Sequence, residues 1–225
     1  SIGPAAKLWK FNSESPIPPE PKKLKNAIGL VDYRNIYIEN GFIGFKKSGM
    51  SLNLGSIGKG YVVDRAVEIL RSSGVKNGLV NAGGDLMAFG LKNGSTPWRI
   101  GLQHPRKPEE IIASLNITDI AVATSGDYQR YFIHDKKRYH HILKPEDGWP
   151  SDKSISATVI ADTVTDADAL STALFILGEK KGIELINSLE GVEGMILSKG
   201  GSVNFSSGFH NLPGLSFYDL KEDLS

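Results

Sequence analysis

Apolar residues recur three and four positions apart over three stretches of the chain, which is the period of an α-helix. This pattern predicts helices over 59–73, 166–177 and 179–189. Gly74 follows the first stretch, and Gly178 separates the other two. Glycine commonly ends helices because it adopts left-handed backbone angles without a steric penalty. We therefore expect one helix in the first half of the chain and two consecutive helices in the second half.

Short runs rich in β-branched and aromatic residues account for most of the remaining pattern, and turn residues separate them. Because these runs outnumber the helices and mostly follow one another as hairpins, they favour the α+β class over a doubly wound α/β sheet. We expect mixed or antiparallel sheets packed with a few helices. Residues 13–26 are rich in Pro, Ser, Glu and Lys and predict a loop, and the C-terminal tail is expected to be irregular. The predicted strands lie within 27–54 and at 78–82, 98–103, 113–117, 121–124, 130–133, 138–143, 154–161 and 195–198.

Composition narrows the class of protein only modestly. The 225 residues suit one large domain or two small ones, and we expect a single domain over 1–225. The sequence has no cysteine, which excludes zinc–thiolate sites, iron–sulfur ligation and thiol catalysis. A net charge of +1 implies no general affinity for nucleic acid. The chain opens at Ser1 without an initiator methionine, so we expect further residues upstream of it.

A glycine-rich segment between a predicted strand and the first predicted helix contains Gly55, Gly58 and Gly60. Glycine lets a ligand approach the backbone closely, and a helix N-terminus favours an anion, so this segment suits a phosphate. It matches neither common nucleotide fingerprint, because no Ser or Thr follows Lys59 and no GxGxxG motif occurs. From these residues alone, an ordinary strand-to-helix turn explains the glycines equally well.

The start of the helix predicted over 166–177 carries a carboxylate and a hydroxyl on one face. Asp168 and Thr172 are four residues apart, so both project from the same side of the helix. Mg²⁺ often takes few protein ligands and completes its shell with phosphate and water, so this pair suits such an ion. The alternative is helix capping, in which Thr165 caps the helix and the acidic residues complement its dipole.

Two further segments combine polar and aromatic residues. The run from Ala123 to Phe132 lies between two predicted strands, and either lines an aromatic ligand or forms a polar loop over buried rings. His140 and His141 are adjacent on a predicted strand, so their side chains point to opposite faces and cannot chelate one metal together. One of the two histidines can therefore face a site while the other faces solvent.

These segments, in this order, resemble the FAD:protein FMN transferase (ApbE) family over most of the chain. The run from Ala167 to Phe175 is very similar to the family's Ala-Asp-Ala-Leu-x-Thr helix, and this match favours the metal interpretation of that helix over capping. The resemblance implies an ApbE-like α+β architecture related to the T-fold. The other matching segments are Ile2–Trp9, Gly55–Asp64, Asn81–Asp85, Ala123–Tyr131 and His141–Gly148.

The resemblance implies binding of FAD in a cleft, with Mg²⁺ held against the pyrophosphate. Family members transfer FMN from FAD to a Thr or Ser hydroxyl of an acceptor protein and release AMP, whereas some hydrolyse FAD to FMN and AMP. The metal ligands then fall at Asp168, Thr172 and the backbone carbonyl of Gly58. The residues expected to contact FAD are Gly55, Ser56, Lys59, Tyr61, Gly83, Gly84, Ser125, Tyr128 and His141.

The chemistry needs a base for the acceptor hydroxyl and charge neutralisation at the phosphates. We predict His141 as the base, with Asp127 in reserve, and Lys59 as a cation that offsets charge as AMP departs. Members of the family often lie outside the bacterial cytoplasmic membrane, exported or lipid-anchored. The resemblance therefore implies the periplasmic side of a cell envelope, with a lipid anchor upstream as one option.

Three departures from the family pattern bear on activity. Asn53 stands where members usually carry Asp, and residues 144–148 read Lys-Pro-Glu-Asp-Gly rather than Asp-Pro-Arg-Thr-Gly. The N-terminal part that helps to hold FAD in the family is also absent from this sequence. Two alternatives therefore stay open, a Mg²⁺-dependent FAD pyrophosphatase and an FAD-binding protein without catalysis.

Overall fold

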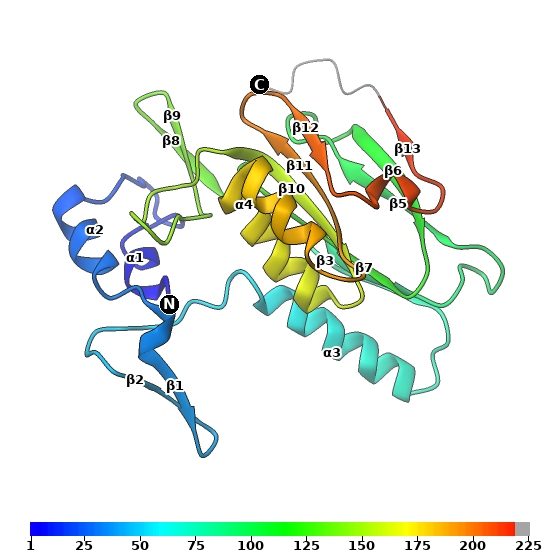
Figure 1. Cartoon of the computed structure of the whole chain (residues 1–225), viewed down its shortest axis with the longest axis horizontal. Coiled ribbons are helices and arrows are strands. Elements are labelled where there is room, and N and C mark those ends of the chain that lie inside the picture. Colours follow the sequence, from blue (N-terminus) through cyan, green and yellow to red (C-terminus); the bar gives the residue numbers. More distant parts are fainter. Residues whose placement is uncertain (219–225) are drawn as a thin grey trace. The chain divides into compact units, whose positions relative to one another are not determined.

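A six-stranded antiparallel sheet is the largest element of the structure, a computed structural model that describes residues 1–218 (Figure 1). Its strand order is β12-β11-β10-β7-β4-β3, and every neighbouring pair is antiparallel. All eight residues of β10 are buried, as expected of a strand covered on both faces. The six strands are β3 (Gly78–Ala82), β4 (Asp85–Phe89), β7 (Ile120–Gly126), β10 (Ser154–Ala161), β11 (Glu193–Ser198) and β12 (Val203–Phe205).

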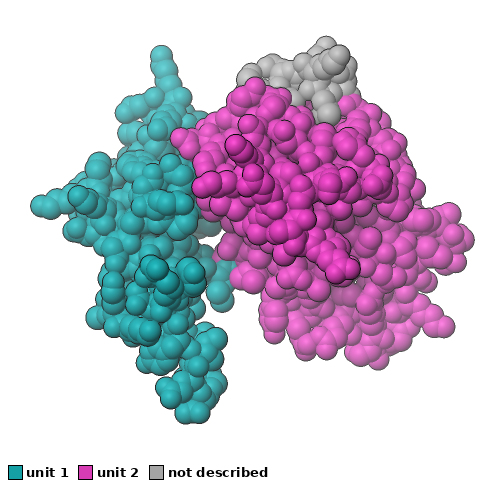
Figure 2. All heavy atoms as spheres, in the orientation of Figure 1, with its two compact units in different colours: residues 1–54, 129–151 teal, residues 55–128, 152–225 magenta. Residues whose placement is uncertain are grey.

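The chain divides into two compact units (Figure 2). Unit 1 contains residues 1–54 and 129–151, and unit 2 contains residues 55–128 and the chain from 152 onward. The six-stranded sheet belongs to unit 2. Each unit is described separately below, and the expected single family domain over 1–225 stays a prediction.

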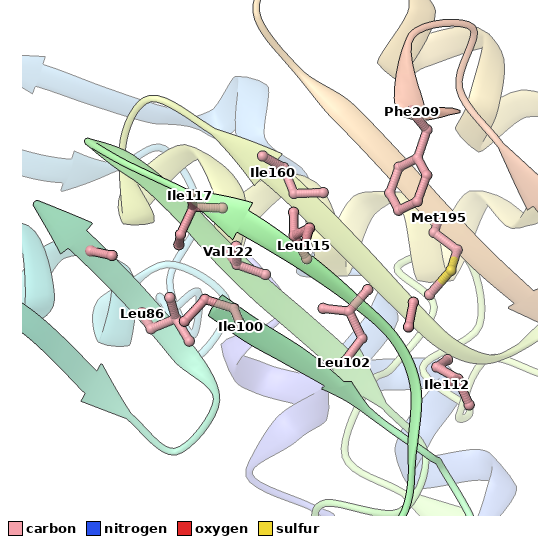
Figure 3. Packing of buried hydrophobic residues seen from close by; sticks show 12 residues of the cluster. Leu86, Ile100, Leu102, Ile112, Leu115, Ile117, Val122, Ile160, Met195 and Phe209 are labelled. Carbon is pink, nitrogen blue, oxygen red and sulfur yellow. The ribbon is translucent and has the colours of Figure 1, made fainter. Parts of the chain in front are cut away.

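A second sheet of unit 2 joins the first through the main apolar core (Figure 3). This three-stranded sheet has the order β13-β6-β5 and contains β5 (Trp98–Gln103), β6 (Ile111–Ile117) and β13 (Ser216–Phe217). Leu102 and Leu115 of this sheet pack in one cluster with Val122 and Ile160 of the larger sheet. Phe209, in a short 3₁₀ helix (η2, Phe209–Asn211), is fully buried in the same cluster.

Two helices of unit 2 pack together, and the longer one lies along the larger sheet. α4 (Val164–Asn187) packs on β7, β10 and β11, and α3 (Gly58–Ser72) packs on α4, β3 and β4 (Figure 1). α4 is kinked at Gly178, whose φ is +80°, so the prediction of two helices separated by this glycine is confirmed. A Cβ at position 178 would also meet the Lys153 side chain at 2.8 Å.

Unit 1 is built around clustered aromatic rings. The indole of Trp9 packs against Phe132 and Trp149, and its Nε1–H donates to the carbonyl of Gly148 at 2.9 Å. Leu24 is buried in the same cluster. The elements of unit 1 are the helices α1 (Gly3–Ala6), α2 (Pro21–Ile28) and η1 (Tyr33–Asn35), the hairpin of β1 (Ile36–Glu39) and β2 (Phe42–Phe45), and the hairpin of β8 (Tyr131–His134) and β9 (Lys137–His140).

Three predictions of local structure were wrong or incomplete. The loop expected over 13–26 becomes helical from Pro21, because proline is favoured in the first turn and Leu24 supplies an apolar anchor. Strand β4 was not predicted. The region expected to be irregular contains β12 and β13, and its last part, 219–225, lies outside the described residues. Over residues 1–218, no helix is both long enough and apolar enough to cross a membrane.

Candidate active site

The N-termini of α3 and α4 cap each other. The carboxylate of Asp64 on α3 accepts hydrogen bonds from the backbone amides of Val164 and Thr165, both at 2.9 Å. Conversely, Oδ2 of Asp168 on α4 accepts from the amide of Gly60 at 3.0 Å. A Cβ at Gly60 would lie 2.3 Å from the carbonyl oxygen of Val164, so only glycine permits this close approach.

This arrangement separates the capping and site interpretations of the α4 N-terminus. The cap is Thr163, which accepts from the amide of Asp166 at 3.1 Å, and not Thr165 as the alternative proposed. Asp168 is buried and bonds to α3, so it does not serve its own helix end. A carboxylate in this position therefore belongs to the region between the two helix starts.

A cluster of hydroxyl groups from α4 and β7 lies next to Asp168. Ser125 Oγ of β7 is 2.9 Å from Ser171 Oγ and 3.1 Å from Thr172 Oγ1. Ser171 Oγ also donates to the carbonyl of Asp168 at 3.0 Å. The structure thus brings together the predicted residues Ser125, Asp168 and Thr172, with oxygen atoms as their polar groups.

Asp85 is a second buried carboxylate of this site. It begins β4, is 1% exposed, and its Oδ2 lies 2.8 Å from Lys59 Nζ. That contact is an ion pair, and the ammonium of Lys59 is also a hydrogen-bond donor to this carboxylate. Burial raises the pKa of Asp85, the negative charge of Asp168 raises it further, and Lys59 and the amide of Thr124 oppose both effects.

These residues fit a hard divalent cation such as Mg²⁺. The carboxylates of Asp85 and Asp168 and the hydroxyl of Thr172 offer only oxygen, which this ion prefers. The buried Oδ2 of Asp85 already faces one cation, the ammonium of Lys59 at 2.8 Å, so its surroundings favour positive charge. Over residues 1–218 no three acidic or histidine side chains form a ready-made cage, so phosphate and water would have to complete the shell.

The predicted glycines differ in backbone conformation and in the space around their Cβ positions. Gly83 and Gly84 have φ of +62° and +101° and form the two-residue turn between β3 and β4, which accounts for both residues without a ligand. Gly58 has open space at its Cβ position and no left-handed backbone, so neither crowding nor strain in the protein explains it. Gly55, Ser56, Lys59 and Tyr61 are exposed around it. Contact of these residues with FAD stays a prediction.

Asp127 is held by an arginine that the sequence did not single out. Its carboxylate accepts from Arg106 Nη1 at 2.7 Å and from Nη2 at 3.1 Å, and it is 2% exposed. Such a paired fork engages both carboxylate oxygens and fixes their orientation, which makes Asp127 a poorer candidate for the reserve base. The ring of Tyr128 lies over Gly126, where an added Cβ would come within 2.4 Å of it.

The two adjacent histidines of unit 1 differ in their surroundings. His140 is buried, its Nε2 is 2.8 Å from the carbonyl of Ser151, and its Nδ1 accepts from the amide of Ile142 at 3.3 Å. His141 is half-buried, and its Nδ1 is 3.2 Å from the carbonyl of Arg130. A carbonyl only accepts, so a hydrogen bond at this position requires Nδ1 of His141 to carry a proton.

Sequence patterns missed three residues that organise the site. Asp64, Asp85 and Arg106 find their partners 100, 26 and 21 positions away in the sequence, so no local period reveals them. Asp64 and Asp85 stood at the ends of segments that carry the family resemblance, which was the available signal. Arg106 had none.

Comparison with known proteins identifies the family to which this chain is similar. The family model described as the ApbE family matches residues 1–196. The FAD:protein FMN transferases of Treponema pallidum and Klebsiella pneumoniae are 32% and 34% identical to the chain, each covering 92% of it. The chain spans 62% and 65% of their respective lengths, which is less than two thirds.

Solved structures agree with the sequence relatives. The crystal structure of the ApbE protein from Thermotoga maritima is 37% identical, with a TM-score of 0.87, over 94% of this chain and 70% of that one. The Pseudomonas stutzeri flavinyl transferase ApbE, in its apo form, is 30% identical, with a TM-score of 0.81, over 95% of this chain and 68% of that one. The predicted α+β class is confirmed, and the chain belongs to the ApbE family.

Proposed function

We propose that the protein transfers FMN from FAD to a threonine or serine hydroxyl of an acceptor protein, releases AMP, and depends on Mg²⁺. The observation that carries this proposal is the convergence of Asp85, Asp168 and Lys59 at the N-terminus of α3. The reaction type is supported by the relatives, which are named FAD:protein FMN transferase.

The start of α3 would bind the pyrophosphate of FAD. The amides of Gly58 and Lys59 precede the first helical hydrogen bond, which runs from Tyr61 to Ile57, so they have no partner within the helix. The helix dipole adds positive potential at this end, and the ammonium of Lys59 offers three more donors.

The buried carboxylate and hydroxyl groups would hold Mg²⁺ nearby. Asp168, Thr172 and the carbonyl of Gly58 are the proposed ligands, and the ion would neutralise charge on the phosphate oxygens. The hydrogen bond from Gly60 to Asp168 fixes that carboxylate before any ligand arrives. Preorganised charge of this kind stabilises a phosphoryl transition state without reorganisation during the reaction.

His141 is the proposed base for the acceptor hydroxyl. The contact of its Nδ1 with the carbonyl of Arg130 orients the ring, and a neutral imidazole of this tautomer would take up the proton of the hydroxyl through Nε2. His140 is excluded from this role because both of its ring nitrogens are engaged inside unit 1. The assignment predicts that the two histidines respond differently to substitution.

One incubation separates the proposed reaction from its alternatives. The protein is mixed with FAD and Mg²⁺, with and without an acceptor protein of a related flavinylation system, and AMP is measured. AMP that appears only with the acceptor, together with flavin on the acceptor, supports transfer. AMP without acceptor identifies an FAD pyrophosphatase, and bound FAD without AMP identifies a binding protein.

The departures from the family pattern make this test informative. Lys144 pairs with Asp147 at 3.0 Å within the turn that follows His141, so this turn carries an internal ion pair. Asn53 removes one negative charge relative to the usual family residue.

A placement on the periplasmic side of a bacterial envelope is a further proposal from the family alone, and cell fractionation tests it.

A further inference from the structure

Two buried carboxylates and one lysine form a group at the N-terminus of α3. Asp85 and Asp168 are 1% and 4% exposed, and the charge of Asp168 acts on Asp85. Lys59 is the cation that the structure pairs with Asp85, at 2.8 Å. Two carboxylates and one ammonium carry a formal charge of −1 at a largely buried position, and a divalent cation would offset this charge.

The partners of the Lys59–Asp85 pair differ in freedom. Asp85 is fixed by its place in β4, which pairs with β7, and by the amide of Thr124. The Lys59 side chain is 42% exposed and ends a flexible four-carbon stem. The ammonium of Lys59 lies 2.8 Å from Asp85 Oδ2, so a divalent cation that binds here would have to replace this contact.

We propose that Lys59 is a resident cation that occupies the carboxylate pair in the metal-free protein and is displaced when a divalent cation binds, with Asp85 as the positioning residue that holds it. This inference rests on the proposed function, since it assumes a metal at Asp168. A divalent cation neutralises both carboxylates by itself, so the ammonium becomes surplus and is repelled. Lys59 is then available to the pyrophosphate of FAD.

The competing explanation is a permanent structural tie between α3 and β4 through the same ion pair. The two explanations predict opposite effects of removing the lysine. If Lys59 competes with the metal, its removal tightens metal binding in the absence of FAD. If Lys59 only holds α3 in place, its removal loosens the site, and metal binding weakens or stays the same.

The test uses Mn²⁺ as the probe, without FAD, and measures its dissociation constant by electron paramagnetic resonance. Lys59→Met should tighten Mn²⁺ binding about five-fold, the upper range for one partly exposed charge pair. Lys76→Met is the matched control, because this exposed lysine lies beyond the opposite end of α3, about 20 Å along the helix. It should leave Mn²⁺ affinity unchanged.

A double-variant cycle shows whether the effect passes through Asp85. Asp85→Asn keeps the shape of the side chain and removes its charge. In that background, Lys59→Met should no longer tighten Mn²⁺ binding, because the lysine has lost the carboxylate that holds it. In the presence of saturating Mg²⁺, Lys59→Met should instead weaken FAD binding, so the same substitution changes the two affinities in opposite directions.

The outcomes separate this inference from the proposed function. If Asp168→Ala abolishes Mn²⁺ binding but Lys59→Met leaves it unchanged or weaker, the resident-cation role is overturned and the metal site stands. If Lys59→Met tightens Mn²⁺ equally with and without Asp85, the positioning role of Asp85 is overturned. If the wild-type protein shows no Asp168-dependent Mn²⁺ binding, both the inference and the proposed metal site fail.

Discussion

Asp168 has two tasks at the residue scale, and the substitution that tests one of them must spare the other. Its Oδ2 accepts the amide of Gly60, so removal of the carboxylate leaves a buried donor without its partner. Loss of such a bond costs about 1–3 kcal/mol of stability. Stability and metal binding therefore change together unless the variants are chosen to separate them.

Asp168→Ala and Asp168→Asn form that matched pair. Both remove the negative charge, so we expect Mg²⁺-dependent release of AMP from FAD to be lost in both. Only the alanine variant also loses the acceptor for Gly60, so only it should unfold at lower urea concentration. Wild-type turnover and magnesium dependence in Asp168→Asn would place the metal elsewhere.

His141 and His140 give a second pair, because their contacts assign them different roles. His141→Asn should slow flavin transfer by about 10²–10⁴-fold at saturating FAD, which is the usual contribution of a general base. His140→Asn should instead lower the melting temperature, since it loses contacts to Ser151 and Ile142. If His141→Asn raises the dissociation constant of FAD and spares the saturated rate, the residue binds flavin and is not the base.

Tyr128 connects burial to stability at high pH. Burial, and secondarily the charge of Asp127, raises the pKa of Tyr128 from 10.0 to about 12. The unfolded chain therefore loses this proton at lower pH than the folded chain, and stability present below pH 10 declines as the pH rises towards about 12. The group should account for up to about 2 kcal/mol of that decline.

The measurement for Tyr128 is urea unfolding at pH 9 and at pH 11.5. Wild type should lose more stability between these values than Tyr128→Phe, which has no phenol to ionise. Tyr61→Phe is the control, because its ring is 59% exposed in the same unit. Equal losses in wild type and Tyr128→Phe would contradict the assignment.

At the scale of elements, the approach of α3 to α4 depends on one glycine and not on its neighbour. Gly60→Ala places a Cβ 2.3 Å from the carbonyl of Val164, a backbone atom that cannot move independently. We expect about 1–3 kcal/mol of destabilisation from this overpacking. Gly58→Ala meets nothing within 4 Å and should fold normally.

The pair of glycine variants therefore separates fold from ligand binding. Gly58→Ala should weaken FAD binding in the presence of Mg²⁺ while its unfolding free energy stays close to wild type. Fluorescence quenching of FAD, with and without Mg²⁺, measures the affinity. Unchanged affinity in both titrations would show that the ligand does not approach the start of α3.

Elements that periodicity or β-branched composition marks were predicted well, and elements that neither marks were missed. β3, β5 and β10 lie at their predicted bounds, and α3 is displaced by one residue at each end. β4 was missed because its five buried residues neither alternate nor include a β-branched residue, unlike those of β10, and because it follows directly on Gly83 and Gly84. α2 was missed because its proline and lysines resemble a loop in composition.

At the scale of the whole molecule, sequence patterns predict only those site residues that lie close together along the chain. The pair Asp168 and Thr172 could be predicted because both residues lie on one helix face. The partners that complete the site come from distant segments, such as Asp85 from β4 and Asp64 from α3, and only folding brings them together. The proposed base, His141, lies in unit 1, whereas the carboxylates lie in unit 2.

Hydrogen–deuterium exchange with FAD and Mg²⁺ tests a segment of each unit separately for protection by the ligand. Residues 55–61 of unit 2 should exchange more slowly when ligand is bound, because their amides would contact the pyrophosphate. If His141 acts on the reaction, residues 139–145 of unit 1 should also be protected. The Asp168→Asn variant is the control, since loss of metal should reduce protection in both segments. Protection of 55–61 alone would remove His141 from the site while leaving the pyrophosphate-binding role of α3 intact. Protection of neither segment would contradict FAD binding at this helix.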